Sequence, residues 1–209
     1  MNALNAERIK QNKPIPLNRL SSLFYNMVKV VNIVASQRLA SSIDVNDVAD
    51  CLDIDYEQEQ FPGMVYRNED PKVCVLLFRS GKAVATGAKS EGDIDIAFNN
   101  LRKDLETNDF ELWKESDCET ILHNIVVTCD VSDVIGEEKI NLSKLMLYLP
   151  FDKTEYEPEQ FPGLIYRVSN PDVVYLIFSS GRCVITGSKD FADAQEAELF
   201  LKDELRSLF

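Results

Sequence analysis

The chain has 209 residues, of which 45% are hydrophobic and 27% are charged, enough apolar side chains for one large domain or two small ones. Its formal net charge of −13 is opposite in sign to the basic footprint usual in nucleic-acid-binding proteins. The apolar runs are too short for a membrane span, and no signal-peptide pattern is found, so we expect no membrane partner.

The cysteines follow no metal-binding or disulfide spacing. Their number is odd and no C-x-x-C pair occurs, which favours a reducing compartment over a disulfide framework or a zinc site. We therefore expect no cofactor and a cytoplasmic protein, or a nuclear one if the source is eukaryotic. The five residues are Cys51, Cys74, Cys118, Cys129 and Cys183.

Residues 1–27 differ in composition from the rest. This segment is polar, contains Pro14 and Pro16, and has a net charge of +3, which leaves −16 for the remainder. We expect a flexible N-terminal arm, in which residues 18–26 are a candidate short helix. Met27 is a candidate alternative start.

The rest of the chain consists of two copies of one unit. Residues 56–90 match residues 156–190 without a gap, with 19 of 35 positions identical, and residues 31–34 match residues 123–126. A period this long is not that of a solenoid. The pattern predicts two fused repeats, 28–117 and 118–209, forming a pseudo-two-fold saddle or barrel.

Each copy has the same predicted order of elements. In the first, we expect a strand over 28–36, a helix over 44–52 behind an Asp44 cap, and strands over 63–68, 73–79 and 82–88, with a tight turn at Gly81. A capping box at Ser90 and Asp93 then begins a long helix. The second copy has eight additional residues, which we place around 132–139 as a longer loop.

The strands have one face for the helices and one face left over. Strand alternation places an apolar set on the second face, with two amides and two hydroxyls, rimmed by Arg and Lys. A large exposed apolar face usually marks a binding surface; the alternative is a sheet covered on both sides. The face comprises Asn32, Val34, Leu76, Phe78, Val84 and Thr86, with Asn124, Val126, Leu176, Phe178, Val184 and Thr186 in the second copy.

No pattern indicates catalysis. The only histidine is His123, and a lone histidine is more often a surface or core residue than a catalyst. Gly87-Ala88-Lys89-Ser90 differs from a P-loop because an alanine separates its glycine from its lysine. We expect the protein not to be an enzyme.

Four motifs occur twice and in order: N-I-V at 32–34 and 124–126, E-Q-F-P-G at 59–63 and 159–163, [LI]-F-x-S-G-[KR] at 77–82 and 177–182, and T-G-[AS]-K at 86–89 and 186–189. In these motifs the chain resembles the TATA-box-binding proteins, in an archaeal-like form. The resemblance implies an α+β saddle: a curved antiparallel ten-stranded sheet with four helices on its convex side and the DNA minor groove on its concave side.

The resemblance also implies a role for each residue set. Asn32, Asn124, Thr86 and Thr186 suit hydrogen bonds to the acceptors of the minor groove, while Val34, Val84, Val126 and Val184 leave no partner for the amino group of guanine. Phe61 with Phe78, and Phe161 with Phe178, resemble two pairs of wedges that unstack base steps. The phosphate contacts are assigned to Arg67, Lys82, Lys89, Arg167, Arg182 and Lys189.

The expected function is that of a general transcription initiation factor, which binds and bends TATA-like promoter DNA and recruits transcription factor B and RNA polymerase. Glu157 and Glu159, in the second acidic loop, are the expected contacts to transcription factor B. The alternative is a divergent paralogue that acts mainly as a protein-interaction module in transcription regulation. An enzyme with an appended saddle is a third class, but the repeats leave no room for a catalytic domain.

Overall fold

The computed structural model of the chain describes residues 28–136 and 139–208. The expected arm, residues 1–27, lies outside the described residues, as does Met27. The described residues form one antiparallel sheet of nine strands, in the order β2-β3-β4-β1-β5-β9-β8-β7-β6. Apart from β6, this order reads as two equivalent halves, β2-β3-β4-β1 and β7-β8-β9-β5, which meet where β1 pairs with β5.

The two repeats supply corresponding elements. The first contains β1 (Lys29–Arg38), α2 (Val45–Leu52), β2 (Gly63–Arg67), β3 (Cys74–Phe78), β4 (Lys82–Ala88), α3 (Glu91–Thr107) and the short η2 (Glu115–Asp117). The second contains β5 (Ile121–Asp130), α4 (Ser132–Ile135), α5 (Leu142–Met146), η3 (Phe151–Lys153), β6 (Thr154–Glu155), β7 (Leu164–Ser169), β8 (Asp172–Ile177), β9 (Arg182–Ser188) and α6 (Phe191–Leu208).

The helix starts follow the predicted caps. The Asp44 side chain accepts a hydrogen bond from the Asn46 N–H at 2.9 Å, and α2 begins directly after it. Ser90 and Asp93 form the expected reciprocal capping box at the start of α3. The backbone N–H groups of Lys89 and Ser90 hold the pKa of Asp93 below its usual value, so this carboxylate stays charged as an acceptor.

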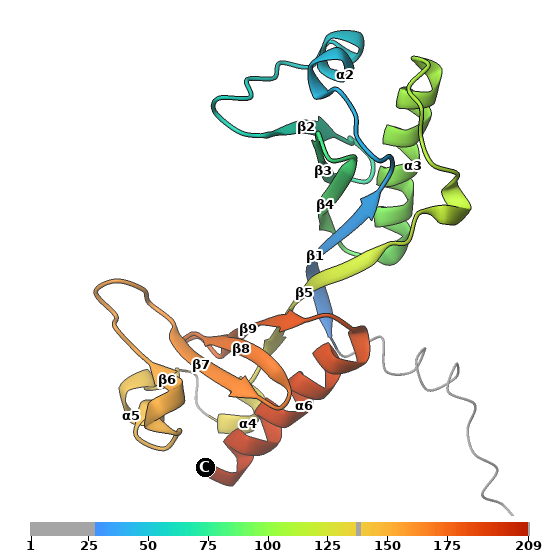
Figure 1. Cartoon of the computed structure of the whole chain (residues 1–209). Coiled ribbons are helices and arrows are strands. Elements are labelled where there is room, and N and C mark those ends of the chain that lie inside the picture. The colour runs from blue at the N-terminus through green and yellow to red at the C-terminus, as the bar shows by residue number, and fades with distance from the viewer. Residues whose placement is uncertain (1–27, 137–138, 209) are drawn as a thin grey trace, which may run out of the picture.

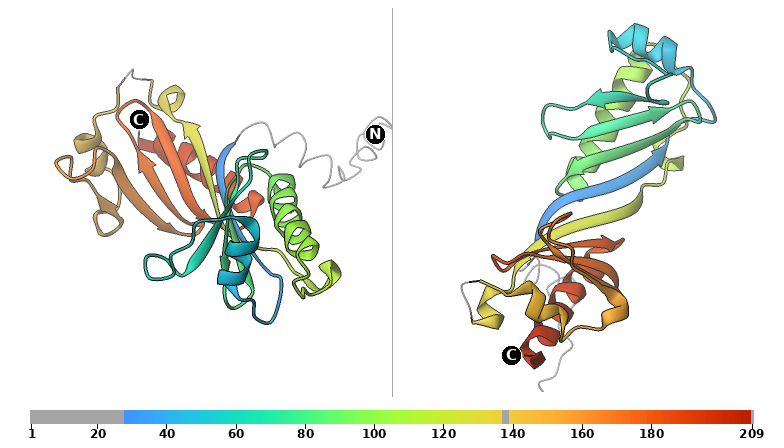
Figure 2. Two further views of the ribbon diagram at one scale, coloured as in Figure 1. Left: turned by 90° about the horizontal axis from the view of Figure 1, so that it is seen from above. Right: turned by 90° about the vertical axis from the view of Figure 1, so that its left-hand side faces the viewer.

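The helices of the described residues cover only one side of the sheet. Figures 1 and 2 show a curved sheet with two lobes, α3 and α6 on its convex side, and α2 and α5 at the outer ends of the lobes. Alternate strand residues, such as Ile33, Ala35, Ile125 and Val127, are fully buried against these helices. No helix of the described chain is long and apolar enough to cross a membrane.

Two equivalent contacts hold the long helices to the outer strands. The Tyr66 hydroxyl on β2 donates to Asp104 Oδ2 of α3 at 2.5 Å, and the Tyr166 hydroxyl on β7 lies 3.0 Å from Glu204 of α6. Burial, reinforced by the neighbouring carboxylate, raises the pKa of both phenols far above the ordinary value. Both hydroxyls therefore remain protonated donors.

The expected number of ten strands is wrong for the described residues. Thr154 and Glu155 pair with Tyr166 and Ile165 as β6, but the counterpart of β6 in the first repeat, residues 54–55, forms no strand. There, α2 ends at Asp53 with a left-handed backbone, and the Ile54 N–H bonds back to the Ala49 carbonyl at 2.9 Å. Because residues 53–54 form this turn at the helix end, they do not pair as a strand.

The eight additional residues of the second repeat are divided between two places, which corrects the expected single loop. Asn32 precedes the Asp44 cap by 12 positions, whereas Asn124 precedes the Asn141 cap by 17, so five of the eight lie before α5. They include the one-turn helix α4 and residues 137–138, which the structure does not describe. The other three lie after α5, where η3 and β6 form.

Candidate nucleic-acid interface

The face opposite the long helices carries the predicted binding set. On β1, β3 and β4, the residues that alternate with the buried ones are half-buried, and the same holds for β5, β8 and β9. The described residues therefore leave this face uncovered, and the alternative of a sheet buried on both sides is wrong for them. The half-buried set comprises Asn32, Val34, Leu76, Phe78, Val84 and Thr86 in the first repeat, and Asn124, Val126, Leu176, Phe178, Val184 and Thr186 in the second.

The centre of this face alternates amide and valine across the pseudo-two-fold axis. Asn32 pairs with Val126, and Val34 pairs with Asn124, in the β1–β5 register. Bulges in this pairing follow Val30 and Val34 and keep both asparagines on the open face. The two repeats thus bring one polar and one apolar group from each side to the same place.

Hydrogen bonds fix which end of each amide points outward. The Gly87 N–H donates to Asn32 Oδ1 at 2.7 Å, and the Gly187 N–H donates to Asn124 Oδ1 at 2.8 Å. A backbone N–H can pair only with the carbonyl end of an amide, so this contact settles the orientation of the side chain. Each NH2 group consequently keeps at least one N–H available as a donor, and that of Asn124 also donates to Thr186 Oγ1 at 3.0 Å.

The threonines lie beside the asparagines. Thr86 Oγ1 is 3.4 Å from Asn32 Oδ1, and Thr186 Oγ1 is 3.0 Å from Asn124 Nδ2. Val34 pairs with Thr86 across β1 and β4, so the polar pairs sit among valines. The outcome is a mostly apolar surface with a few donors near its centre, a pattern that matches the acceptor-lined minor groove of A·T pairs.

A pair of phenylalanines stands at each end of the face. Phe61 and Phe78 have ring centroids 6.2 Å apart, and Phe161 and Phe178 have centroids 5.8 Å apart, both edge to face. Phe61 is 42% exposed, unusually much for so large an apolar side chain. The predicted pairing of these residues within each repeat is therefore confirmed, while their role as wedges remains a prediction.

Glycines make room for both pairs. A Cβ at Gly63 would lie 2.9 Å from ring atoms of both Phe61 and Phe78, and one at Gly163 would lie 2.7 Å from Phe161. Gly63 and Gly163, the last residues of the two F-P-G motifs, thus leave the space in which the phenylalanine rings pack against the backbone. Sequence reasoning did not assign this role.

The predicted phosphate contacts all lie on the protein surface. Arg67, Lys82, Lys89, Arg182 and Lys189 are exposed at strand ends. Arg167 is exposed as well, but its Nε lies 3.6 Å from Glu155 Oε1. An exposed ion pair of this kind is worth about 0–1 kcal/mol, so a phosphate can replace Glu155 as the partner of Arg167.

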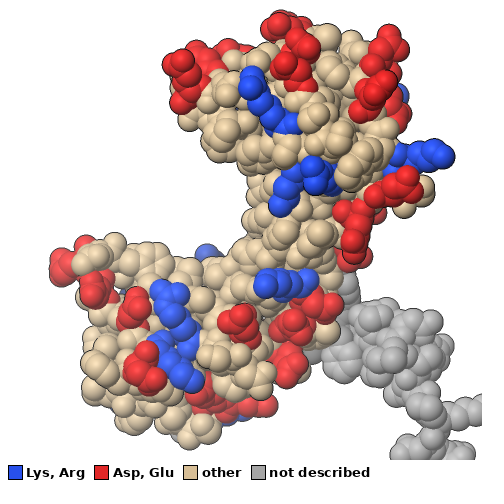
Figure 3. All heavy atoms as spheres, in the orientation of Figure 1, with Lys and Arg blue, Asp and Glu red and all other residues tan. Residues whose placement is uncertain are grey.

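The acidic groups gather elsewhere. Figure 3 shows many of them at the outer ends of the lobes, whereas the region between the lobes is largely uncharged with basic groups nearby. Glu157 and Glu159 are exposed in the loop before β7, and the Glu157 carbonyl accepts the N–H groups of Gln160 and Phe161. Acidic and basic side chains thus lie on different parts of the surface, which the net charge of the chain does not reveal.

The remaining candidates carry no chemistry of their own. His123 is exposed, and its Nε2 lies 2.6 Å from Ser36 Oγ, a structural contact between β5 and β1. Across the described residues no His, Cys, Asp and Glu side chains group as metal ligands, and all five cysteines are free thiols. What sequence reasoning missed was the pair of backbone donors at Gly87 and Gly187; the T-G motifs placed them next to the threonines but gave no sign of their partners.

Comparison with known proteins agrees with this geometry. The family model described as transcription factor TFIID, or TATA-binding protein, matches residues 27–108 and 119–208. The TATA-box-binding protein of Natronomonas pharaonis is 44% identical over 175 residues, covering 81% of this chain and 88% of that protein. The one from Thermoplasma volcanium is 41% identical over 182 residues, covering 87% and 95%.

A solved structure shows the same fold. The TBP of Methanococcus jannaschii superposes with a TM-score of 0.75 at 42% identity, covering 87% of this chain and 99% of that one. Family model, relatives and fold thus agree, and the matched residues include most of each repeat. The chain belongs to the TATA-binding protein family of transcription factors.

Proposed function

We propose that this protein is a general transcription initiation factor that binds TATA-like promoter DNA through the minor groove and bends it. The observation that carries the proposal is the pair of asparagine amides whose carbonyl ends are held by Gly87 and Gly187, which directs two donors outward from an apolar face. Adenine N3 and thymine O2 are acceptors at every A·T pair, whereas a G·C pair adds a donor that this face leaves unpaired. The family is one of transcription factors and not of enzymes.

Asn32→Ala and Asn124→Ala are each expected to weaken binding to an A·T-rich duplex by about 1–3 kcal/mol, since each removes an oriented donor to a base edge. Asn46→Ala on the exposed surface of α2 is the matched control and should leave affinity unchanged. The measurement is equilibrium binding by fluorescence anisotropy at one fixed salt concentration.

Substituting base pairs in the DNA shows which groove the protein reads. Inosine·cytosine pairs present the minor-groove surface of A·T pairs, so their substitution should preserve binding. Loss of binding on that substitution would show that the protein reads the major groove. A wild-type protein with no A·T preference in a selection from random duplexes would instead favour the alternative, a paralogue that acts mainly through protein contacts.

We further propose that the loop carrying Glu157 and Glu159 recruits transcription factor B, and through it RNA polymerase. Both carboxylates are exposed beside Phe161, which places them next to the bound DNA in the proposed complex. Charged groups at the rim of an interface act mainly on encounter rate and specificity. A basic surface on the partner is the expected complement, and a cytoplasmic, nucleoid-associated location follows from the proposed role.

Glu157→Lys combined with Glu159→Lys is therefore expected to leave binding to DNA alone nearly unchanged and to weaken the ternary complex about tenfold or more, as charge reversal sets like charges opposite one another. The first repeat offers the matched control, Glu57→Lys with Glu59→Lys in the equivalent loop. Gel mobility shifts with and without transcription factor B distinguish the two complexes. Equal effects of both pairs would contradict an assignment to the second loop.

A further inference from the structure

The two repeats differ in what covers one end of the sheet. In the first repeat, the segment between α3 and β5 turns back across the end of the helix; we call residues 110–118 the return segment. The Trp113 carbonyl accepts a hydrogen bond from Arg102 Nη1 at 2.7 Å, and the Cys118 carbonyl accepts one from Gln37 Nε2 at 3.2 Å. The Arg38 guanidinium lies 5.5 Å from the Trp113 ring centroid.

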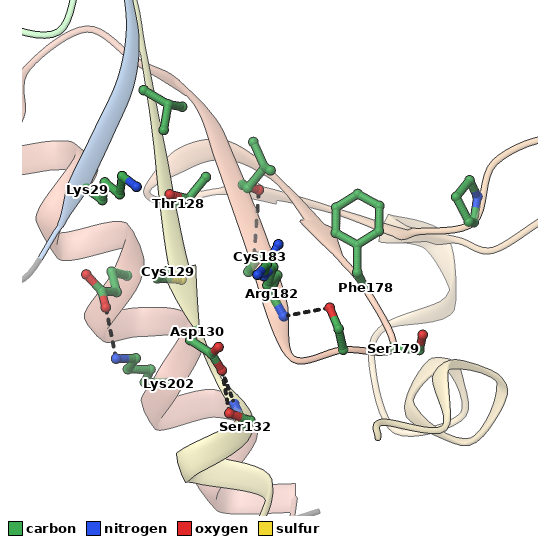
Figure 4. Close-up of a pocket in the computed structure, with 15 residues that line it drawn as sticks. Lys29, Thr128, Cys129, Asp130, Ser132, Phe178, Ser179, Arg182, Cys183 and Lys202 are labelled. Carbon is green, nitrogen blue, oxygen red and sulfur yellow. Dashed lines mark hydrogen bonds and ion pairs between the residues drawn. The ribbon is translucent and has the colours of Figure 1, made fainter. Parts of the chain in front are cut away.

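The equivalent place on the second repeat is a groove. The counterparts of Gln37, Arg38 and Arg102 are Cys129, Asp130 and Lys202, by the offsets of 92 and 100 that relate the copies. All three line a groove of about 1150 Å³. Figure 4 shows them on β5 and α6, with Arg182 and Cys183 of β9 and Lys29 of β1 around the same space.

The first repeat has a smaller hollow at this place, partly walled by the return segment, whereas the groove of the second repeat also reaches Pro162, Phe178 and Val184. That hollow measures about 440 Å³, and Trp113 and Asp117 of the return segment form part of its lining. None of the described residues plays the part of the return segment on the second repeat. The groove is thus the open counterpart of a place that the protein fills once already.

One oxygen of a buried carboxylate beside the groove lacks a donor. Glu198 on α6 is only 2% exposed, and its Oε1 pairs with Lys202 Nζ at 2.9 Å. Its Oε2 has no hydrogen-bond partner among the described residues, and Glu198 lines the groove. A buried acceptor without a donor is costly, and the first repeat has the apolar Phe98 at the same position. Of the two repeats, only the second therefore has a buried acceptor at this position, Glu198 Oε2, that a hydrogen-bond donor would stabilise.

The pseudo-two-fold axis identifies the segment that fits. The return segment leads directly into β5 at Ile121, and the residue equivalent to Ile121 is Lys29, which begins β1 and lines the groove. Residues 18–26 therefore stand in the same relation to the second repeat as residues 110–118 stand to the first. Both stretches are rich in large apolar residues: Phe110, Leu112 and Trp113 in one, and Leu20, Leu23, Phe24 and Tyr25 in the other.

We propose that residues 18–26 bind in the groove between β5, β9 and α6 and cover it as the return segment covers the first repeat. Leu20 and Phe24 supply the apolar contacts, and the donors of Arg19, Ser21 and Ser22 are within the same stretch to satisfy Glu198. One contact differs between the copies. The Leu39 carbonyl accepts the Trp113 N–H at 2.7 Å, whereas its counterpart on Val131 already accepts the N–H groups of Val134 and Ile135 in α4.

Alkylation of native cysteines tests this docking in the full chain. Leu20→Asp with Phe24→Asp is expected to raise the rate of iodoacetamide modification of half-buried Cys129 about fivefold or more, because reactivity follows the fraction of time the covered site is open. Exposed Cys51, on α2 of the other lobe, should react at an unchanged rate. Leu4→Asp with Ile9→Asp, outside the proposed segment, is the matched control.

Peptide mass spectrometry of the reduced protein separates docking from unfolding, since fully buried Cys183 reacts only if the second repeat opens. A rate at Cys129 that is the same in wild type and in the Leu20/Phe24 variant, with Cys183 protected in both, would overturn the proposal.

A cross-link gives a second result that does not depend on those variants. With the photoreactive p-benzoylphenylalanine at position 24 of the otherwise unchanged chain, we expect cross-links to peptides of β5 or α6 within the same molecule. Cross-links between chains would show that a second copy is the partner of the segment. Cross-links to the first repeat, or none, would equally overturn the proposal.

Discussion

Replacing both Phe78 and Phe178 by alanine is expected to remove most of the bend in bound DNA and to weaken binding about 100-fold or more, because each ring contributes about 1.5–3 kcal/mol of buried apolar contact. The two rings lie at opposite ends of the open face, each beside a second phenylalanine. An apolar side chain inserted between base pairs unstacks them and kinks the duplex, and without it the duplex gains nothing by opening its groove.

The bend is measured by fluorescence energy transfer between dyes at the two ends of a short duplex. Lys82→Ala is the control, because a phosphate contact positions the duplex without unstacking it; this variant should lose affinity but keep the bend. Single variants should each remove the kink at one end only. If the double variant bends DNA as the wild type does, these rings do not intercalate.

Gly81→Ala is expected to cost about 3–5 kcal/mol of folding stability, among the largest effects of any single substitution. Gly81 turns the chain between β3 and β4 with φ of +73°, its N–H donates to the Phe78 carbonyl at 2.9 Å, and its carbonyl accepts the Leu39 N–H at 2.8 Å. A Cβ there would lie 2.2 Å from the Ala40 carbonyl oxygen, a backbone atom that cannot turn away. The substitution must therefore distort the pairing of β1 with the turn.

Gly136→Ala is the matched control, because Gly136 has φ of +70° but a Cβ there would meet nothing within 4 Å. It should cost only the left-handed backbone penalty of about 1–2 kcal/mol. Urea denaturation with an unchanged m-value gives both free energies of unfolding. Equal losses for the two variants would mean that the backbone angle, and not the contact with Ala40, determines the effect at Gly81.

The repeat made much of this structure predictable from the sequence. Strand alternation assigned Val34, Val84 and Thr86 to the open face, and the structure leaves all three half-buried there. The caps at Asp44 and Ser90 gave helix starts because a side-chain oxygen at that position has a definite N–H partner two or three residues ahead. Such signals are local, and they lie within a few residues of the feature they specify.

The features that escaped prediction depend on contacts between distant residues. Gly87 holds the amide of Asn32 from 55 positions away, and nothing near either residue indicates the bond. The strand at Thr154–Glu155 exists because three additional residues free the chain after α5, while the same stretch of the first repeat is held in the turn at Asp53. The family resemblance implied a tenth strand, at a point where the lengths of the two copies differ.

The order of the strands also determines the distance along the sheet between the two phenylalanine wedges. From β3, which ends at Phe78, to β8, which precedes Phe178, the sheet order β3-β4-β1-β5-β9-β8 contains five steps between neighbours. At about 4.8 Å a step, the path between the two wedges along the curved sheet is about 24 Å. Stacked base pairs rise about 3.4 Å each, so this span corresponds to about seven base pairs. In the proposed complex, the spacing between strands thus fixes the number of base pairs between the two kinked steps. Promoter sites in which the two flexible steps lie one base pair closer or farther apart should fit the protein less well.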